Sequence, residues 1–177
     1  MRRAVVWLTM ITVALVLVGG GVALAKKIRC DGGGCFGTNR ADSMYGTNRY
    51  DAMYAKRGND YLTGRGAGDN LNGQEGNDRV YGGYGDDWVK GGKQADVVKG
   101  GLGNDRITGG SGNNTLRAGD GQRDLIVCSP NSYNFIYFDP GLDHFSNCVF
   151  RDGALKAKAH QSEAYVTARG LPKKSGS

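Results

Sequence analysis

The chain carries a pattern of polar and apolar positions that repeats every nine residues between residues 37 and 127. Each unit has one acidic position, and an aliphatic or Met side chain follows two residues later. The acidic positions are Asp42, Asp51, Asp60, Asp69, Asp78, Asp87, Asp96 and Asp105, continued in the same register by Asn114 and Arg123. The apolar positions are Met44, Met53, Leu62, Leu71, Val80, Val89, Val98, Ile107, Leu116 and Leu125. Two columns held in one register predict a repeat protein in which each unit buries one apolar side chain.

Glycines fill the remaining fixed positions of the unit. The clearest copies are residues 82–90 and 100–108, which both read G-G-x-G-x-D-x-U-x, where U is apolar. This unit resembles the RTX, or haemolysin-type, calcium-binding nonapeptide repeat. The resemblance implies an all-β fold, a right-handed parallel β-roll. Six residues of each unit would form a turn and three a short strand, so that two units complete one coil.

The residue types of the unit suit calcium on physical grounds. Glycine permits backbone conformations that let carbonyl oxygens converge, and a ligand set of carboxylate and carbonyl oxygens suits Ca²⁺ better than Mg²⁺. In the resembled family an ion lies between two turns one coil apart, which implies the pairs Asp60–Asp78, Asp69–Asp87, Asp78–Asp96 and Asp87–Asp105. The candidate calcium ligands are Asp60, Asp69, Asp78, Asp87, Asp96, Asp105, Gly73, Gly76, Gly82, Gly83, Gly85, Gly91, Gly92, Gly100, Gly101 and Gly103.

The units differ in quality along the chain. The first two, ending at Asp42 and Asp51, keep one glycine each and are expected to bind metal poorly. Asn114 and Arg123 replace the acid in the last two units, so the ligand column is expected to end after Asp105. Beyond it, residues 134–136 and 143–145 repeat the spacing in a shifted register, which predicts a capping end for the roll.

The first 25 residues have the features of a signal peptide. Two arginines precede a run without charge, and the run ends in small residues before Lys26 and Lys27. Export of the chain with cleavage after Ala25 is the preferred interpretation. The alternative is an uncleaved N-terminal helix that anchors the protein, because the run is close to the length that spans a bilayer.

Four cysteines in an exported chain predict two disulfides. Three connectivities are open, and we prefer Cys30–Cys35 with Cys128–Cys148 because both close short local loops. The expected organisation is a signal peptide (1–25), an N-terminal cap (26–36), the β-roll (37–127), a C-terminal cap (128–150) and a basic, mobile tail (151–177).

Enzyme signatures are absent from the sequence: it contains no H-E-x-x-H, and residues 109–113 fail the G-x-S-x-G pattern at the last place. The core of the roll is thin, and burial of one apolar side chain per unit does not offset the entropy of ordering so many glycine-rich residues. We therefore expect a monomeric, secreted, calcium-binding protein that is not an enzyme. Its folding would depend on calcium, its role would be structural or adhesive, and it would keep no membrane span after cleavage.

The charge of the chain suggests an alternative function. Its net charge is +6, although repeats of this type are usually acidic. Strand alternation would place basic and aromatic side chains on the outer faces of both sheets. Those side chains are Tyr45, Tyr61, Arg79, Tyr81, Lys99 and Arg117 on one sheet, and Tyr54, Trp88, Lys90 and Arg106 on the other. Such surfaces suit anionic polysaccharide, envelope polymer or extracellular nucleic acid.

Overall fold

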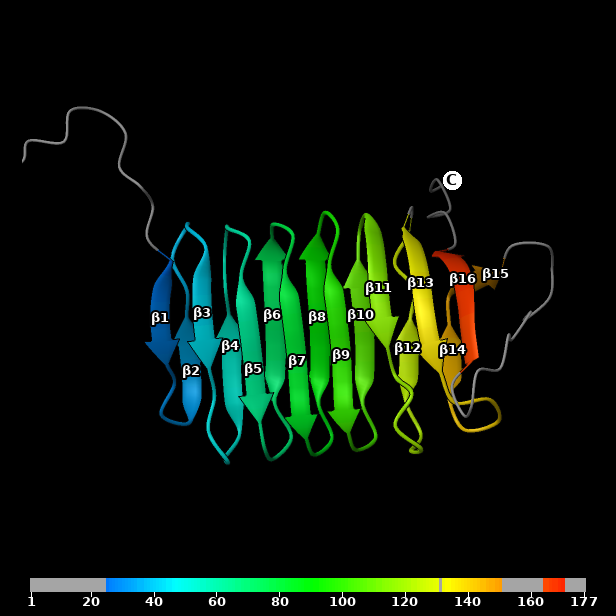
Figure 1. Ribbon diagram of the computed structural model, residues 1–177, viewed down its shortest axis with the longest axis horizontal. Coiled ribbons are helices and arrows are strands. Elements are labelled where there is room, and N and C mark those ends of the chain that lie inside the picture. The colour runs from blue at the N-terminus through cyan, green and yellow to red at the C-terminus, as the bar shows by residue number, and fades with distance from the viewer. Residues whose placement is uncertain (1–24, 131, 151–163, 171–177) are drawn as a thin grey trace, which may run out of the picture.

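The computed structural model describes residues 25–130, 132–150 and 164–170, and these residues form a parallel β-solenoid without a helix (Figure 1). Short strands alternate between two sheets, so the chain coils along one axis and the two sheets face each other. The strands are β1 (Lys26–Arg29), β2 (Gly33–Phe36), β3 (Asp42–Tyr45), β4 (Asp51–Tyr54), β5 (Tyr61–Arg65), β6 (Asn70–Glu75), β7 (Arg79–Tyr84), β8 (Trp88–Lys93), β9 (Val97–Leu102), β10 (Arg106–Gly110), β11 (Asn113–Arg117), β12 (Leu125–Val127), β13 (Tyr133–Phe138), β14 (His144–Ser146), β15 (Cys148–Phe150) and β16 (Ala164–Gly170).

Odd-numbered strands form one sheet and even-numbered strands the other, except that β16 joins the sheet of odd-numbered strands. One sheet has nine strands in the order β1-β3-β5-β7-β9-β11-β13-β16-β15, and the other has seven in the order β14-β12-β10-β8-β6-β4-β2. Neighbouring strands of the roll are parallel and one coil apart, as in the pairing of Leu62 with Val80 and of Val80 with Val98. The predicted parallel β-roll is therefore confirmed, and the outward residues predicted for each sheet lie on strands of that sheet.

The core is a double column of apolar side chains between the sheets. Every predicted apolar position from Met44 to Leu116 is fully buried. The prediction is wrong for the last unit, where Ile126 is fully buried and Leu125 is only partly buried. The physical reason is one extra residue in the turn before β12, which moves the acidic position of that unit from Arg123, which is exposed, to Asp124.

The roll extends beyond the range of residues predicted for it. At the N-terminal end, β1 and β2 already form a coil, with Ile28 aligned with Met44 and Cys35 with Met53. At the C-terminal end, Ile136 in β13 continues the core column. The segments expected to be separate caps thus contain coils of the roll itself.

The C-terminal segment differs from the expected tail. Residues 164–170 form β16, which pairs antiparallel with β13 and with β15 and so covers the end of the nine-stranded sheet. The rest of the predicted tail, residues 151–163 and 171–177, lies outside the described residues, as do the signal peptide and its alternative, a membrane anchor, over residues 1–24. Nowhere in the described part of the chain is there a helix long and apolar enough to cross a membrane.

Both predicted disulfides are present. Cys30 bonds to Cys35 and Cys128 to Cys148, and no described cysteine is free. The first bridge lies in the first coil and the second joins the turn after β12 to β15. The two covalent links therefore hold opposite ends of the roll.

Candidate metal centre

The acidic positions of the repeats form two columns that run the length of the roll, one at the start of each sheet's strands. One column contains Asp42, Asp60, Asp78, Asp96, Asn114 and Asn134, and the other contains Asp51, Asp69, Asp87, Asp105, Asp124 and Asp143. All of them except Asp143 are buried. These columns bring together the residue pairs predicted from the sequence.

Within a column, each carboxylate except that of Asp42 is oriented by a backbone hydrogen bond from the preceding coil. The N–H of Asp69 donates to Oδ1 of Asp87 at 2.7 Å, and the N–H of Asp87 donates to Oδ1 of Asp105 at 2.8 Å. The other column repeats this geometry, because the N–H of Asp60 donates to Oδ1 of Asp78 at 2.8 Å. One oxygen of each of these carboxylates is thereby satisfied, and its side chain is fixed.

The second oxygen of most column carboxylates is buried and has no hydrogen-bond partner. This holds for Oδ2 of Asp60, Asp69, Asp78, Asp87, Asp96, Asp105 and Asp124. Oδ1 of Asp42 and Oδ2 of Asp120 are also buried and unpartnered. A buried carboxylate oxygen without a partner is costly. A row of such carboxylates is stable only when protons or cations neutralise the negative charge.

The surroundings of these oxygens fit a hard cation. A Cβ added at Gly82 would meet both Oδ2 of Asp87 and the carbonyl oxygen of Gly100, which belongs to the next coil. Gly73 has the same relation to Asp78 and to the carbonyl oxygen of Gly91. A carboxylate oxygen and a carbonyl oxygen therefore converge on a spot that only glycine leaves open. Such an all-oxygen donor set suits calcium.

The predicted glycine ligands occupy the positions that this geometry needs. Gly91 and Gly100, at the first place of their units, are related to Asp96 and Asp105 as Gly82 is to Asp87. The second-place and fourth-place glycines lie at φ between 105° and 139°, where a side chain would be strained; they are Gly76, Gly83, Gly85, Gly92, Gly101 and Gly103. Two units without a fourth-place glycine keep this turn conformation because Ala67 and Gln94 adopt φ 68° and 72° there.

No group of three or more His, Cys, Asp or Glu side chains that could hold a metal converges in the described part of the chain. The column carboxylates meet in stacked pairs instead. Any further ligands of a cation between two turns would then be backbone carbonyl oxygens, which is the role that the nonapeptide pattern gives to its glycine-rich turn.

Electrostatics reinforce the need for positive charge in the columns. Burial raises the pKa of Asp87 to about 8, against the opposing hydrogen bond from the N–H of Asp69, and the negative charges of Asp105 and Asp69 add to the rise. Burial likewise raises the pKa of Asp60 to about 7, helped by the charge of Asp78. Each of these carboxyls resists ionisation in the folded chain until a cation offsets its charge.

The columns begin with carboxylates whose Oδ2 atoms have hydrogen-bond donors from the protein itself. Oδ2 of Asp42 accepts from the backbone N–H of Thr38 at 2.6 Å and from its Oγ1 at 2.9 Å. Oδ2 of Asp51 accepts from the N–H of Thr47 at 2.7 Å and from its Oγ1 at 3.0 Å. Threonine at the second place of these units thus donates two hydrogen bonds to an oxygen that has no partner in later coils. This geometry accounts for the expected poor metal binding of the first two units.

Asp124 is a column residue that the sequence reasoning missed. Its Oδ1 accepts from the N–H of Asp105 at 2.7 Å across a separation of 19 residues, and its Oδ2 is buried without a partner. The acidic column on this side therefore continues past Asp105, contrary to the predicted end. The triplet Asp124-Leu125-Ile126 keeps the acid–x–apolar spacing and is the pattern in the sequence that could have revealed the shift.

A parallel β-roll with glycine-lined turns and stacked carboxylates is typical of solenoid proteins whose turns form metal sites. The family model of the RTX calcium-binding nonapeptide repeat matches the chain at residues 36–67, 63–98 and 90–124, which together span about half of it. The chain belongs to this calcium-binding repeat family. No curated protein and no solved structure matches it.

Proposed function

We propose that the chain is a secreted, non-catalytic protein whose roll is stabilised by calcium bound between turns and which has a structural or adhesive role outside the cell. The observation that carries the proposal is the double row of buried, unpartnered carboxylate oxygens. The pairs Asp60–Asp78, Asp78–Asp96, Asp69–Asp87 and Asp87–Asp105 would hold ions, and Asp105–Asp124 extends the set. Bound calcium supplies the positive charge that these carboxylates lack.

Binding and folding are one equilibrium in this proposal. A ligand that binds only the folded chain stabilises it in proportion to the logarithm of the ligand concentration. The unfolded chain cannot hold two aspartates eighteen residues apart in register, so it offers no comparable site. The two disulfides agree with export, because such bonds persist in oxidising compartments.

Far-UV circular dichroism of residues 26–177 during a calcium titration tests this proposal. We expect weak β-structure in chelator and a cooperative gain of β-structure as calcium is added. Magnesium at the same concentration serves as the control, and it should order the chain poorly because it demands a tighter octahedral geometry. A chain that is fully folded and melts cooperatively in chelator would contradict calcium-dependent folding.

Binding of an anionic polymer is a second candidate function, supported by the outer faces of the roll. Tyr45, Tyr61 and Tyr81 form a ladder of rings on the nine-stranded sheet, with centroid separations of 6.0 and 5.4 Å. On the seven-stranded sheet, the guanidinium of Arg106 lies 5.8 Å from the ring centroid of Trp88. Exposed basic and aromatic side chains of this kind bind polyanions.

A further inference from the structure

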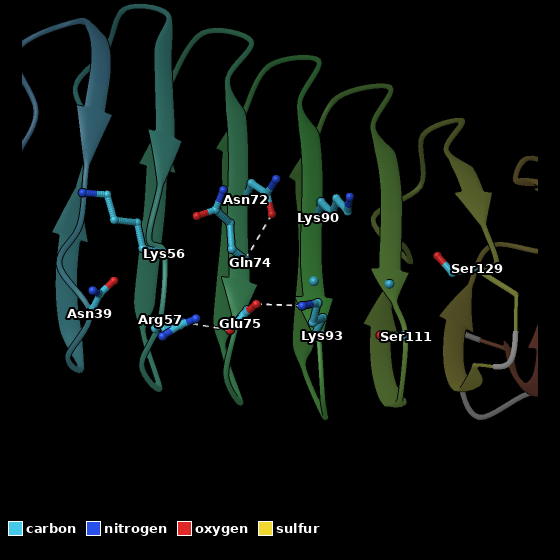
Figure 2. A pocket seen from close by; sticks show the side chains of 12 residues that line it. Asn39, Lys56, Arg57, Asn72, Gln74, Glu75, Lys90, Lys93, Ser111 and Ser129 are labelled. Carbon is cyan, nitrogen blue, oxygen red and sulfur yellow. Dashed lines mark hydrogen bonds and ion pairs between the residues drawn. The ribbon is translucent and has the colours of Figure 1, made fainter.

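A groove of about 590 Å³ crosses the C-terminal ends of successive strands of the seven-stranded sheet, where the turns begin (Figure 2). Successive coils contribute one side chain each from the third place of the turn: Asn39, Arg57, Glu75, Lys93, Ser111, and then Ser129 beyond them. Since neighbouring strands lie about 4.8 Å apart, six coils give the groove a length of roughly 24 Å. An open channel of that length fits a linear polymer.

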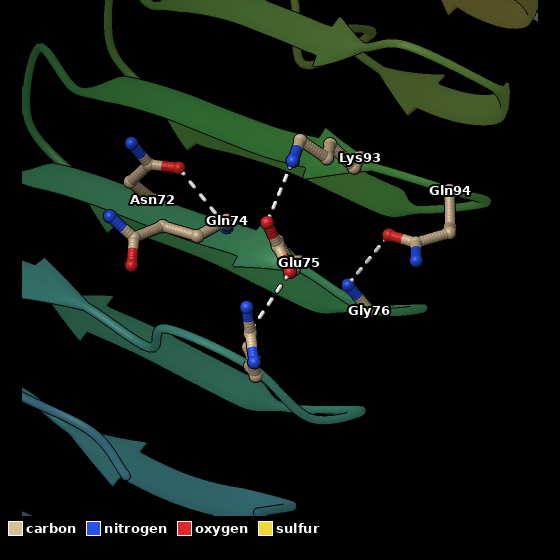
Figure 3. Close-up of polar contacts among 7 residues, drawn as sticks. Asn72, Gln74, Glu75, Gly76, Lys93 and Gln94 are labelled. Atoms are coloured by element: carbon tan, nitrogen blue, oxygen red, sulfur yellow. Dashed lines mark hydrogen bonds and ion pairs between the residues drawn. The ribbon is translucent and has the colours of Figure 1, made fainter. Parts of the chain in front are cut away.

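The groove is cationic. Lys56, Arg57, Lys90 and Lys93 line it and are exposed, and Glu75 is its single acidic residue. Oε2 of Glu75 accepts from Nε of Arg57 at 3.1 Å, and Oε1 accepts from Nζ of Lys93 at 2.7 Å (Figure 3). Four cations and one anion leave a net charge of +3.

The ion pairs orient the cations without hiding them. The side chains of Arg57 and Lys93 remain 70% and 64% exposed, against 38% for Glu75, so most of each cation still faces solvent. Glu75 therefore holds a positive group on either side of itself, one coil away in each direction. The spacing of about two coils, roughly 10 Å, separates the two cations along the groove.

Two of the polar side chains that line the groove come from residues with an unusual backbone conformation. Lys56 and Gln74 adopt φ 79° and 74° at the second place of the turn, where the next two coils have Gly92 and Gly110. Residues other than glycine rarely adopt this backbone conformation. The turn geometry thus places both side chains in the lining of the groove.

The lining selects among anionic polymers. Amide and hydroxyl groups, such as those of Asn72 and Ser111, accompany the cations, and no aromatic side chain lines the groove. Single-stranded nucleic acid is bound largely by stacking of bases on aromatic rings, which this groove does not provide. Sugar hydroxyls with regularly spaced anionic groups match the amides, hydroxyls and cations.

A second hollow lies where the strands of the same sheet begin. It is lined by Asp69, Asp86, Asp87, Asp105 and Asp124, with two arginines. Four of these aspartates are the column residues proposed above to hold calcium. We propose that the groove containing Lys56, Arg57, Lys90 and Lys93 binds a linear anionic polysaccharide, a proposal that rests on the second candidate function above.

Binding of chondroitin sulfate to the full chain, purified in calcium and mild detergent, tests the groove. Lys56→Gln places at φ 79° the residue type that Gln74 already supplies at φ 74°, so the turn is retained. Lys93→Gln breaks only an exposed ion pair, which contributes little to stability. Arg65→Gln is the matched control: Arg65 is exposed at φ 86° in the second place of a turn of the other sheet, lies outside the groove, and loses the same single charge.

We expect Lys56→Gln and Lys93→Gln each to weaken binding about three- to five-fold, in line with the loss of one exposed charge contact. The Arg65→Gln control should bind as the wild type does, and neutral dextran should not bind. Absence of chondroitin sulfate binding, an equal loss in Arg65→Gln, or tighter binding of oligothymidylate would each overturn the proposal.

Circular dichroism and calcium binding, measured on the same samples, separate this test from that of the calcium proposal. Normal ordering by calcium without polymer binding overturns the groove alone. A chain that is folded without calcium and still binds chondroitin sulfate through Lys56 and Lys93 supports the groove and overturns calcium-dependent folding.

Discussion

Replacing Asp87 by Asn should weaken two cation sites, whereas replacing Asp69 should weaken one. Asp87 lies between Asp69 and Asp105, and all three carboxylates have a buried Oδ2 without a partner. Asp69 has such a neighbour on one side only, because Oδ2 of Asp51 is satisfied by Thr47. The two substitutions are therefore chemically identical but differ in the number of sites that they affect.

The magnitude follows from the number of sites. An ion that binds only the folded state contributes about 2.7 kcal/mol when its concentration is a hundred times its Kd. Under that condition, Asp69→Asn should lower the free energy of unfolding by up to about 2.7 kcal/mol and Asp87→Asn by up to about 5.4 kcal/mol. Asparagine keeps the Oδ1 acceptor, as Asn114 does when it accepts from the N–H of Asp96 at 3.0 Å. The decrease in the free energy of unfolding therefore measures the effect of removing the carboxylate charge.

Urea unfolding at a fixed excess of calcium measures the loss, and equilibrium dialysis counts the ions that each variant retains. Asp86→Asn is the control, because Asp86 is an exposed neighbour outside the columns and its Oδ1 acceptor for the N–H of Asn104 is kept. Equal losses from Asp69→Asn and Asp87→Asn would refute the placement of ions between stacked pairs. If Asp86→Asn lowered the free energy of unfolding as much as Asp87→Asn does, the net charge of the roll, and not ions between stacked pairs, would determine its stability.

Three further results are expected. Thr47→Val removes a hydroxyl donor to a buried carboxylate and should lower the free energy of unfolding by about 1.5–3 kcal/mol, measured by urea unfolding at saturating calcium. The number of bound calcium ions should not change, and Thr108→Val, at an outward position, is the control. Without calcium, β-structure measured by circular dichroism should increase as the pH falls from about 8 to 4. The reason is that burial raises the folded-state pKa of Asp87 to about 8, against its ordinary value of 3.8, so the folded chain binds more protons than the unfolded chain in that window. A rise in structure toward pH 8 would contradict this. Replacing Cys128 and Cys148 together by Ala should cost about 3 kcal/mol, and an unchanged urea midpoint would show that the bridge adds no stability.

The repeat could be predicted from the sequence because two independent columns share one period. The acid must start each strand and the apolar side chain must point inward, so a shift of either column by one residue would expose the core. Met44 and Asp42 therefore predict the register of every coil through Leu116. The rule fails at Arg123, because a turn at the surface can accept an extra residue without disturbing the strands on either side.

The hydrogen bonds of Thr38 and Thr47 could not be predicted from the pattern. The sequence shows only that the first two units lack glycine at both the second and the fourth place, which suggests a weaker site. It does not show that the threonine N–H and hydroxyl both turn toward the carboxylate of their own unit. Similarly, β16 gives no strand pattern of its own, and its conformation follows from pairing with β13 and β15.

At the ends of both carboxylate columns the protein itself provides the partners of Oδ2 or replaces the carboxylate by an amide, and the column Oδ2 atoms without a partner lie between these ends. At the starts, threonine satisfies Oδ2 in both columns. One column ends in an amide chain, in which Nδ2 of Asn114 donates to Oδ1 of Asn134 at 3.0 Å. The other ends at Asp143, whose two oxygens accept from the N–H groups of Asp124 and Asp139 at 2.9 and 2.8 Å.

The disulfides lie at these same two ends. A terminal coil has a neighbour on one side only, so an ion there would lack the ligands that a second coil supplies. Hydrogen bonds and covalent bonds can hold an end without a neighbour, whereas stacked carboxylate pairs require one. The chain thus uses local bonds where the solenoid stops and metal-binding turns where it continues, which explains why the unpartnered Oδ2 atoms of the columns begin at Asp60 and Asp69 and end at Asp96 and Asp124.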